Sequence, residues 1–382
     1  MARTNDRHRL LDYWLGVPLI ALVGGLRRRR CIPHNVQRIG IFSPTAIGDL
    51  ILDSGILLHL RQVFPFASIH LFYGPTNAQV VPLLPVDVQA HCCDFKQARA
   101  TIAAIRKSRL DVVVDLTPWP RLTALYAALS GAVTVGFRAE NQHRHYAFDV
   151  AVPHLRTRHE VDNLRALAEV FAPCQEYRVA LRHDLPEPPL TPLPYDRLVL
   201  CHISPGGSQA DSKRWPVQHW VELVRRLSAD GFIVGFTGSQ VDAGAAQTVI
   251  SAARLPPEAV LSLCGKMSLG ELAGALRKAR LLITVDTGVL HMASALDVNT
   301  VALHGPTRSS RWGARSPATI SLDAPHPAAG FIHFGFESND QGAATMQALS
   351  VDCVYEAAKV ALQRNGETPL LHMQQLAELA TL

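Results

Sequence analysis

Four loops in this sequence combine glycine with charged or hydroxyl side chains, and each follows an expected strand. The clearest is Asp286-Thr287-Gly288, which lies between the apolar run 282–285 and a helical pattern containing His291. A strand that turns directly into a helix presents backbone N–H groups and the positive end of the helix dipole to one point, which suits a phosphate or diphosphate. The alternative is that Asp286 or Thr287 only caps the helix and that His291 is a hydrogen-bonded core residue.

Two further loops in the same half of the sequence have a similar character. Residues 204–208 (SPGGS) precede Lys213, and residues 237–240 (TGSQ) again lead from a strand into a helix. Adjacent glycines let backbone N–H groups approach an anion, and Lys213 supplies a mobile positive charge. The alternative for Lys213 and Arg214 is a solvated surface pair.

The fourth loop, residues 43–49 (SPTAIGD), lies near the start of the sequence. Gly48 allows the backbone to turn tightly, and Asp49 begins the next helix. Asp49 either caps this helix, which is the commoner role of aspartate there, or supplies a carboxylate that accepts a proton from a hydroxyl group.

Several other chemistries are disfavoured by what the sequence does not contain. It has no Asp-x-Asp pair to chelate a metal for a sugar nucleotide, so we expect no metal and no cofactor. It also has no Walker lysine loop and no G-x-G-x-x-G motif after a strand, which argues against an NTPase or a dehydrogenase. The net charge of +5 fits an anionic substrate or a membrane surface, and no lysine-rich tract with interleaved aromatics favours nucleic acid. The seven cysteines form no C-x-x-C pair, which indicates reduced thiols in the cytoplasm.

Short aliphatic runs alternate with helical patterns in two stretches of the chain, which indicates parallel sheets covered by helices on both faces. Strands are expected at 38–43, 69–73, 111–116, 133–137, 198–203, 231–237, 260–263, 282–285 and 300–304. Helices are expected at 50–64, 95–108, 122–130, 160–171, 217–228, 241–253 and 269–279, and one begins near Gly288. We therefore expect an α/β protein of two doubly wound, Rossmann-like domains that face a central cleft, with ligands at the carboxyl ends of the strands.

The 382 residues, 48% of them hydrophobic, suffice for two globular domains. We expect an N-terminal apolar and basic segment at 1–35, a first domain at 36–184, a proline-rich linker at 185–195, a second domain at 196–350 and C-terminal helices at 351–382.

The N-terminal segment combines the apolar residues 14–26 with four arginines, Arg27 to Arg30. The apolar run is shorter than the roughly 20 residues that a membrane-spanning helix needs, and no signal-peptide cleavage site follows it. We expect a helix or hairpin that lies in the cytoplasmic face of a membrane, with its arginines on anionic head groups. Deleting residues 1–30 should then release the protein from membranes without unfolding it. The alternative is a helix that packs on the protein itself.

The sequence resembles glycosyltransferase family 9, the ADP-heptose:lipopolysaccharide heptosyltransferases, which have the GT-B fold. The matching segments occur in the family's order, and the combination of K-R-W-P with D-T-G-x-x-H is specific. They are residues 47–65 (IGDLILDSGILLHLRQVFP), DVVVDL from Asp111, 130–137 (SGAVTVGF), 204–223 (SPGGSQADSKRWPVQHWVEL), 264–296 (CGKM to SAL) and 301–307 (VALHGPT).

The resemblance implies a role for several residues. Asp49 would deprotonate the acceptor hydroxyl, Lys213 would neutralise the departing diphosphate, and Met267 would lie beside the adenine. Gln240 stands where the family often places an acidic residue on the ribose, a role for which Asp242 is a substitute. The donor site would comprise Gly48, Ser208, Gln240, Met267, Asp286, Thr287, Gly288 and His291, with the amides of Thr287 and Gly288 on the pyrophosphate.

The resemblance also implies the reaction: an inverting, metal-independent transfer of heptose from ADP-heptose to a lipopolysaccharide core or related glycan. The protein would work peripherally on the inner face of the bacterial inner membrane. Candidates for contacting the anionic, lipid-linked acceptor are Arg121 and Arg138, with Arg144 and Lys96, although each is alternatively an ordinary surface charge. Other possibilities are a family member that uses another nucleotide sugar, a GT-B-fold nucleotide-sugar epimerase, for which a second carboxylate is not evident, and a ligand-binding protein, which would normally be exported.

Overall fold

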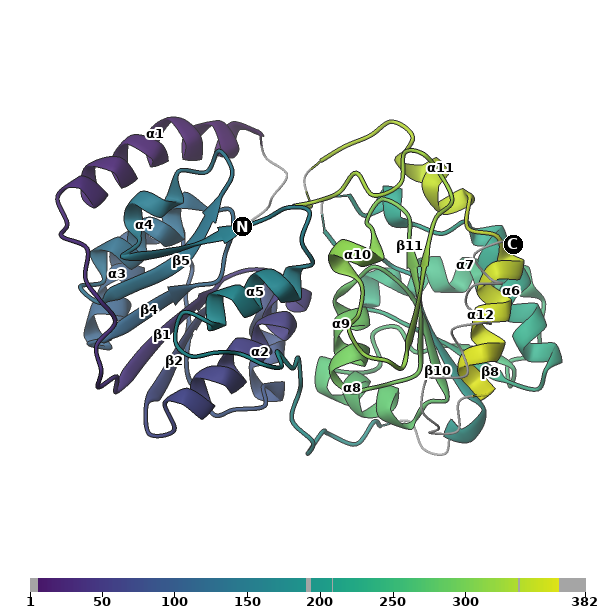
Figure 1. Ribbon diagram of the computed structural model, residues 1–382. Helices are drawn as coiled ribbons and strands as arrows, with labels where there is room; N and C mark the ends of the chain where they lie inside the picture. Colours follow the sequence, from purple (N-terminus) through teal and green to yellow (C-terminus); the bar gives the residue numbers. More distant parts are fainter. Residues whose placement is uncertain (1–5, 190–193, 208, 336, 364–382) are drawn as a thin grey trace. The chain divides into compact units, whose positions relative to one another are not determined.

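The computed structural model describes residues 6–189, 194–207, 209–335 and 337–363 (Figure 1). The chain forms two compact units, residues Met1–His183 and Asp184–Leu382, here called unit 1 and unit 2. Part of the expected linker (190–193), Ser208, and parts of the expected terminal segments (1–5 and 364–382) lie outside the described residues.

Unit 1 is built on a six-stranded sheet in the order β3-β2-β1-β4-β5-β6, in which every neighbouring pair is parallel. The strands are β1 (Arg38–Ser43), β2 (Ser68–Tyr73), β3 (Gln89–Cys92), β4 (Val112–Asp115), β5 (Val133–Ala139) and β6 (Val150–His154). The helices are α1 (Asp6–Gly25), α2 (Ile47–Val63), α3 (Ala98–Lys107), α4 (Arg121–Leu129) and α5 (Glu160–Ala168), with 3-10 turns η1 (Pro75–Leu83) and η2 (Arg144–Ala147).

Unit 2 repeats this design with a parallel sheet in the order β12-β11-β10-β7-β8-β9. Its strands are β7 (Leu198–His202), β8 (Ile233–Thr237), β9 (Val260–Ser262), β10 (Leu281–Val285), β11 (Thr300–His304) and β12 (Thr319–Asp323). Its helices are α6 (Val217–Ala229), α7 (Ala243–Ala253), α8 (Leu269–Lys278), α9 (Gly288–Ala295), α10 (Ser309–Trp312), α11 (Gly342–Gln347) and α12 (Val351–Gln363). The 3-10 turns are η3 (Tyr195–Arg197), η4 (Asp211–Lys213) and η5 (Gln240–Asp242).

The strand order reverses at one place in each sheet, between β1 and β4 in unit 1 and between β7 and β10 in unit 2. Such a reversal leaves a crevice at the carboxyl ends of the two strands, where ligands of doubly wound sheets bind. The loop with Asp49 follows β1, the segment with Lys213 follows β7, and Asp286 follows β10. The expected α/β architecture is thereby confirmed for each unit.

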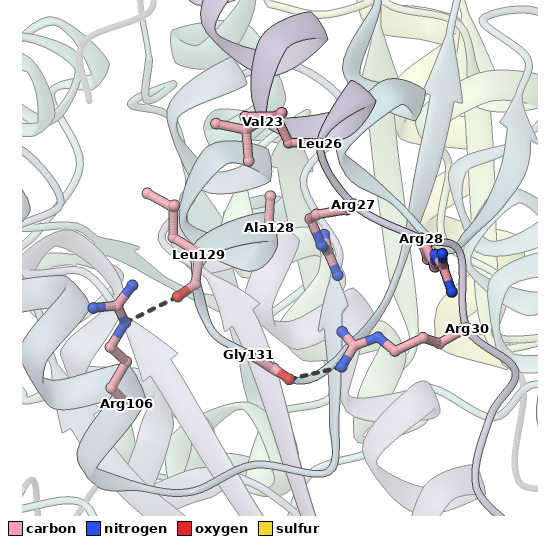
Figure 2. Close-up of a pocket in the computed structure, with 9 residues that line it drawn as sticks. All are labelled: Val23, Leu26, Arg27, Arg28, Arg30, Arg106, Ala128, Leu129 and Gly131. Atoms are coloured by element: carbon pink, nitrogen blue, oxygen red, sulfur yellow. Dashed lines mark hydrogen bonds between the residues drawn. The ribbon is translucent and has the colours of Figure 1, made fainter.

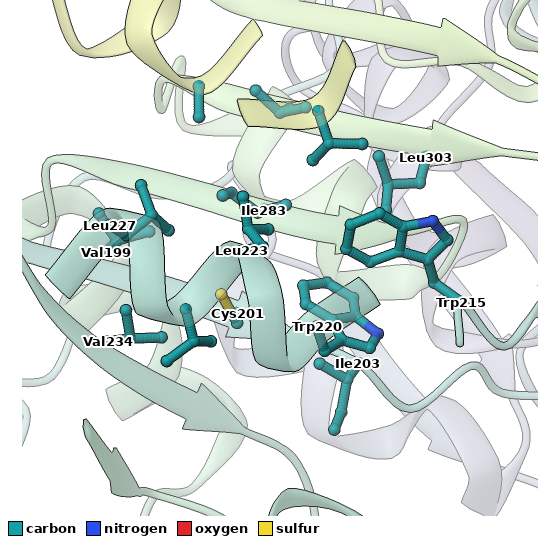
Figure 3. Packing of buried hydrophobic residues seen from close by; sticks show 14 of the residues in the cluster. Val199, Cys201, Ile203, Trp215, Trp220, Leu223, Leu227, Val234, Ile283 and Leu303 are labelled. Carbon is teal, nitrogen blue, oxygen red and sulfur yellow. The ribbon is translucent and has the colours of Figure 1, made fainter. Parts of the chain in front are cut away.

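The core of unit 2 explains how the segment after β7 is held. Strand β10 is buried along its whole length, and α6 packs Trp220, Leu223 and Leu227 against the sheet (Figure 3). Trp215 lies edge-on to Trp220 with 4.9 Å between ring centroids, and its Nε1 donates to the Leu349 carbonyl at 3.0 Å. The indole therefore anchors the residues that directly follow Lys213.

Three strands were not expected from the sequence: β3, β6 and β12. Each is at an edge of its sheet, where one side has no neighbouring strand. Their sequences, QAHC, VAVPH and TISLD, mix polar residues or proline into the strand, whereas central strands such as β4 (VVVD) and β10 (LLITV) are mainly aliphatic. The helix after β1 also begins earlier than expected, at Ile47, so Gly48 lies within α2 and not in the turn before it.

The N-terminal segment forms one helix, α1, and not a hairpin. Helix α1 lies against α4 and η2 of unit 1 (Figure 1), so the alternative in which it packs on the protein holds for one of its faces. Among the described helices, none is both long and apolar enough to cross a membrane.

Candidate functional site

An ion pair between a partly exposed lysine and a buried aspartate lies where the strand order of unit 2 reverses. Lys213 Nζ is 2.8 Å from Asp286 Oδ2, and the two side chains are 16% and 9% exposed. Lys213 ends η4 after β7, and Asp286 follows β10 directly. Because β7 and β10 are paired in parallel, their carboxyl ends are adjacent, and this brings together residues 73 positions apart in sequence.

The surroundings of Asp286 keep it ionised. Burial alone would raise the pKa of this carboxyl, but the charges of Lys213, His304 and His291 hold it well below its usual range. Burial lowers the pKa of His304, although the Asp286 carboxylate raises it. His291 is also buried, within α9. The site is therefore a fixed carboxylate that holds a lysine, with two histidines close by.

Thr287 and Asp286 have different roles at the start of α9. Thr287 Oγ1 accepts the N–H of Val289 at 3.2 Å, so Thr287 is the N-cap of α9. Asp286 instead accepts from Lys213. Gly288 is the first residue of the helix. The positive end of the α9 dipole thus lies next to Lys213 and Asp286, an arrangement suited to a phosphate group.

Lys213 and Arg214 are not an equivalent surface pair. Arg214 is exposed and forms an ion pair with Asp211, with 3.1 Å between Nε and Oδ1. Lys213 lies in the site, and Trp215 lies in the core. In the loop before them, Gly207 has a φ of +87°, a left-handed conformation that favours glycine.

The loop after β8 approaches the segment that contains Met267. Gly265 donates its N–H to the Gly238 carbonyl at 2.9 Å. The exposed Gln240 lies close to Gly265: a Cβ added to Gly265 would be 2.3 Å from Gln240 Oε1. Half-buried Met267 follows two residues later. Asp242 accepts the Ser239 N–H and hydroxyl, both at 2.7 Å, so its carboxylate caps this turn.

In unit 1, the candidate residue Asp49 lies half-buried in the first turn of α2, where Oδ2 accepts the Ala46 N–H at 3.2 Å. One turn further along α2, Asp53 is buried and accepts the Ser43 hydroxyl at 2.6 Å. Burial raises the pKa of Asp53 well above its usual range, although the Ser43 hydrogen bond lowers it. The two carboxyl groups on one helix therefore have different environments.

The basic residues predicted to contact an acceptor differ in their accessibility. Arg138 is exposed at the carboxyl end of β5, and Lys96 is also exposed. Arg121 is 2% exposed and donates to Asp12 of α1 and to the carbonyls of Asn141 and Gln142. Its guanidinium group therefore joins parts of unit 1 to one another. Arg144 is fully buried against Asp115. For these two arginines the expectation of an acceptor contact is corrected.

The described part of the chain contains no cluster of three or more histidine, cysteine, aspartate and glutamate side chains arranged to hold a metal ion.

The chain is similar in sequence to a known protein family. The model of glycosyltransferase family 9 (heptosyltransferase) matches residues 98–329. The chain belongs to glycosyltransferase family 9. Lipopolysaccharide heptosyltransferase 1 of Pseudomonas aeruginosa is 34% identical over 164 residues, which are 41% of this chain and 44% of that protein. The alignment to this relative therefore spans less than half of its length.

Two further relatives extend the similarity over more of the chain. Lipopolysaccharide heptosyltransferase 1 of Escherichia coli K12 is 28% identical over 316 residues, covering 76% of this chain and 94% of that protein. The structure of an E. coli heptosyltransferase with ADP matches with a TM-score of 0.68 at 20% identity, covering 85% of this chain and 100% of that chain. The structural likeness shows that this family 9 protein has the GT-B fold.

Two residues beside the candidate site residues of this family 9 protein, His304 and Asp53, were not predicted from its sequence. His304 ends β11, the strand next to β10, so its place at the end of an aliphatic run could have indicated it. Asp53 follows Asp49 by one helical turn, a spacing that could have indicated a shared face. The Arg144–Asp115 pair joins positions 29 apart, and no local signal reports it.

Proposed function

We propose that this protein is an inverting, metal-independent glycosyltransferase that moves heptose from ADP-heptose to a lipopolysaccharide core or related glycan. Membership of glycosyltransferase family 9 supports sugar transfer, and the names of its relatives support heptose and lipopolysaccharide. A structural relative was solved with ADP, which supports an ADP-linked donor. The observation that carries the proposal is the Lys213–Asp286 pair beside the start of α9, because it provides fixed positive charge where a diphosphate leaving group needs it.

In the proposed reaction, the acceptor hydroxyl oxygen attacks the anomeric carbon, and the bond from that carbon to the diphosphate oxygen breaks in the same step. The hydroxyl proton passes to Asp49, and the bonding electrons leave with ADP. A single displacement of this kind inverts the configuration at the anomeric carbon. Asp49 is suited to be the base because it is only half-buried, whereas Asp53 is enclosed and already accepts the Ser43 hydroxyl.

In this proposal Lys213 and the amide groups of Thr287 and Gly288 receive the negative charge that develops on the diphosphate. Asp286 acts as a positioning residue, because it holds the Lys213 ammonium at 2.8 Å. Lys213 carries three donors and can keep Asp286 while it binds a phosphate oxygen. Positive charge supplied by the lysine and the helix dipole does the work that a divalent cation does in other transferases.

We place the rest of the donor around the same crevice. Met267 would contact the adenine and Gln240 the ribose, since their loops adjoin through the Gly265–Gly238 hydrogen bond. Asp242 is a weaker candidate for the ribose than the sequence indicated, because its carboxylate already accepts two hydrogen bonds from Ser239. Arg138 is the remaining candidate for contact with an anionic acceptor. The protein would work peripherally on the inner face of the inner membrane, where such an acceptor is lipid-linked.

A donor panel tests this proposal. Purified protein is titrated with ADP-, UDP- and GDP-linked sugars by calorimetry, and each donor is then incubated with heptose-free lipopolysaccharide core. We expect ADP-heptose to bind at least about tenfold more tightly than the others, a difference of ~1.4 kcal/mol, and to yield heptosylated core with inverted configuration. Tighter binding of another nucleotide, or conversion of the donor to an epimer without transfer, would contradict it.

A further inference from the structure

Helix α1 is part of unit 1, although it precedes the first strand. Ile20 is 1% exposed and belongs to the same core cluster as Phe42 and Tyr126, with Val23 packed against that cluster. Gly24 approaches η2 so closely that a Cβ there would be 2.1 Å from the Tyr146 carbonyl oxygen. The inward face of α1 is thus fitted to the body of the unit.

Ion pairs fix α1 within the helix and just beyond its end. In the first half of the helix, Asp12 pairs with Arg121 at 2.7 Å. Just beyond its end, Arg27 pairs with Asp149 at 3.0 Å, and Arg30 donates to the Gly131 carbonyl at 2.8 Å. These contacts hold the helix in one rotational setting, so its outward face has a fixed direction relative to the sheet of unit 1.

The outward face of α1 is apolar. Trp14 is 70% exposed and Leu26 is 80% exposed, and the leucines between them form a continuous stripe at helical spacing. Leu15, Leu19, Leu22 and Leu26 follow one another at helical spacing, and the other exposed large residues of α1 are Tyr13 and Trp14. The segment 13–26 contains no acidic residue. A contiguous apolar surface of this kind indicates a site that another apolar phase covers.

Arginines border this apolar face at its C-terminal end. Arg28 and Arg29 are exposed directly after Leu26 and Arg27. Beside them is an open depression of about 770 Å³ with an apolar floor of Val23, Leu26, Ala128 and Leu129 and with arginines around it (Figure 2). The arginines are Arg27, Arg28, Arg30 and Arg106.

The arginines of the depression are held in position. Arg30 donates to the Gly131 carbonyl and Arg106 to the Leu129 carbonyl at 3.1 Å, and Figure 2 shows each guanidinium group beside the carbonyl to which it donates. Guanidinium groups bind phosphate oxygens in a planar, bidentate manner. An apolar floor under such a rim matches an amphiphile with a phosphate head.

We propose that α1 and this arginine-lined depression form a docking surface for a bilayer that carries anionic phosphate head groups. The apolar stripe from Trp14 to Leu26 enters the boundary between head groups and acyl chains, and lipid phosphates bind Arg28, Arg29 and the depression. Charge complementarity selects this occupant: the face joins leucines and a tryptophan to the exposed Arg28 and Arg29, whereas Asp149, which pairs with Arg27 and Arg30, has a side chain only 2% exposed. Interfacial helices on anionic membranes combine apolar and basic residues in the same way. This inference deepens the peripheral location proposed above and does not depend on the sugar or the nucleotide.

The structure also changes how the surface should be tested. Deleting residues 1–30 would remove Ile20 from the core and leave Arg121 and Asp149 without the partners described above. Substitutions on the outward face avoid this, because those side chains are exposed. The apolar variant is Leu15→Ser with Leu22→Ser and Leu26→Ser, and its matched control is Phe66→Ser, a fully exposed phenylalanine elsewhere on unit 1. The charge variant is Arg28→Glu with Arg29→Glu, matched by Arg254→Glu on unit 2.

Full-length protein and variants are sedimented with vesicles of phosphatidylethanolamine and phosphatidylglycerol, and with vesicles of phosphatidylcholine alone. We expect the wild type and both controls to bind the anionic vesicles and to bind phosphatidylcholine poorly. The charge variant should lose at least about 30-fold in affinity, because two basic residues at the surface are reversed. The apolar variant should lose on the order of tenfold or more, because three leucines no longer enter the boundary of the bilayer. The emission of Trp14, isolated by comparison with Trp14→Phe, should shift to the blue on binding.

Equal binding of the surface variants and the wild type would overturn the proposal, as would equal affinity for both vesicle types. Self-association that Leu22→Ser abolishes, with no vesicle binding, would assign the face to a second copy of the chain instead. Transfer to a deacylated, water-soluble acceptor is measured in parallel, and the surface variants should keep the wild-type rate. A wild type that binds vesicles but transfers no heptose would refute the proposed activity and leave the docking surface standing.

Discussion

Units 1 and 2 share a strand order but differ in what lies where that order reverses. In unit 2 the reversal carries a lysine–aspartate pair beside a helix N-terminus. In unit 1 it carries the half-buried Asp49 on one side, and on the other the buried Asp115–Arg144 pair. The same strand order thus carries a lysine–aspartate pair beside a helix N-terminus in one unit and a half-buried carboxylate in the other, because the residues that follow the strands differ while the fold does not.

The two ion pairs differ in how accessible their basic residues are. Arg144 is enclosed and also donates to Thr123 Oγ1 at 3.1 Å and the Pro120 carbonyl at 3.1 Å, so its donors join the end of β4, the loop after it and the first turn of α4. Lys213 in unit 2 remains partly exposed beside the start of α9. The first pair fixes a loop, and the second leaves a positive charge available to a ligand.

The largest effect should come from Asp49→Asn in unit 1. The amide keeps the size of the side chain but cannot take up the proton of the sugar-acceptor hydroxyl. We therefore expect heptose transfer to fall about 10²- to 10⁴-fold. Transfer is measured as initial rate at saturating donor. Asp87→Asn, on another loop of unit 1, is the control and should keep the wild-type rate. Transfer by Asp49→Asn at the wild-type rate would remove Asp49 as the base.

A somewhat smaller loss is expected from Lys213→Ala in unit 2. Without the ammonium group the departing diphosphate loses one fixed positive partner, which should reduce kcat/KM by about 10²- to 10³-fold. Arg214→Ala is the matched control, since Arg214 is exposed and pairs with Asp211. If both variants behaved alike, Lys213 would be an ordinary surface charge.

Stability should separate the two arginines of unit 1. Arg144→Met leaves Asp115 buried without its ionic partner and should reduce the free energy of unfolding by about 3–5 kcal/mol. Arg138→Met, at an exposed position, should change it by less than about 0.5 kcal/mol. Urea unfolding followed by circular dichroism measures both. A small loss in Arg144→Met would show that the buried pair does not hold the loop.

His202 of unit 2 should contribute to the acid sensitivity of the protein. Burial lowers the pKa of His202, at the end of β7, from 6.5 to about 4, although hydrogen bonds and Asp242 raise it. The unfolded chain therefore takes up a proton that the folded chain does not, so stability from neutral His202 is complete above pH 6.5 and is lost as the pH falls toward 4. The loss should not exceed about 3 kcal/mol. His202→Asn should show a flatter profile in urea unfolding between pH 7 and 4.5; an unchanged slope would contradict the assignment.

Patterns local in sequence predicted most of this fold. Central strands such as β10 are covered on both faces and must be apolar throughout, so their position and type could be predicted from sequence alone. The edge strands β3, β6 and β12 lack that constraint, since solvent satisfies one side of each. Their mixed sequences therefore gave no strand signal.

Site residues were predictable where they belong to a strand–helix junction, as Asp286 and Thr287 do. The different contacts of these two residues could not be predicted, because the pairing of β7 and β10 brings Lys213 to Asp286. The same limit applies to Arg121, whose partner Asp12 is 109 positions away. The sequence around a basic residue does not show whether its side chain is exposed to solvent or forms an ion pair with a carboxylate far away in the chain.

Titration of ADP into Asp49→Asn, Lys213→Ala and the wild type shows whether Lys213, and not Asp49, holds the diphosphate. If unit 2 holds the diphosphate through Lys213, Asp49→Asn should bind ADP with the wild-type Kd, whereas Lys213→Ala should bind it about 10- to 100-fold more weakly, the equivalent of losing a ~1.5–3 kcal/mol charged hydrogen bond. Unchanged ADP affinity in Lys213→Ala, or an equal loss in Asp49→Asn, would contradict this account.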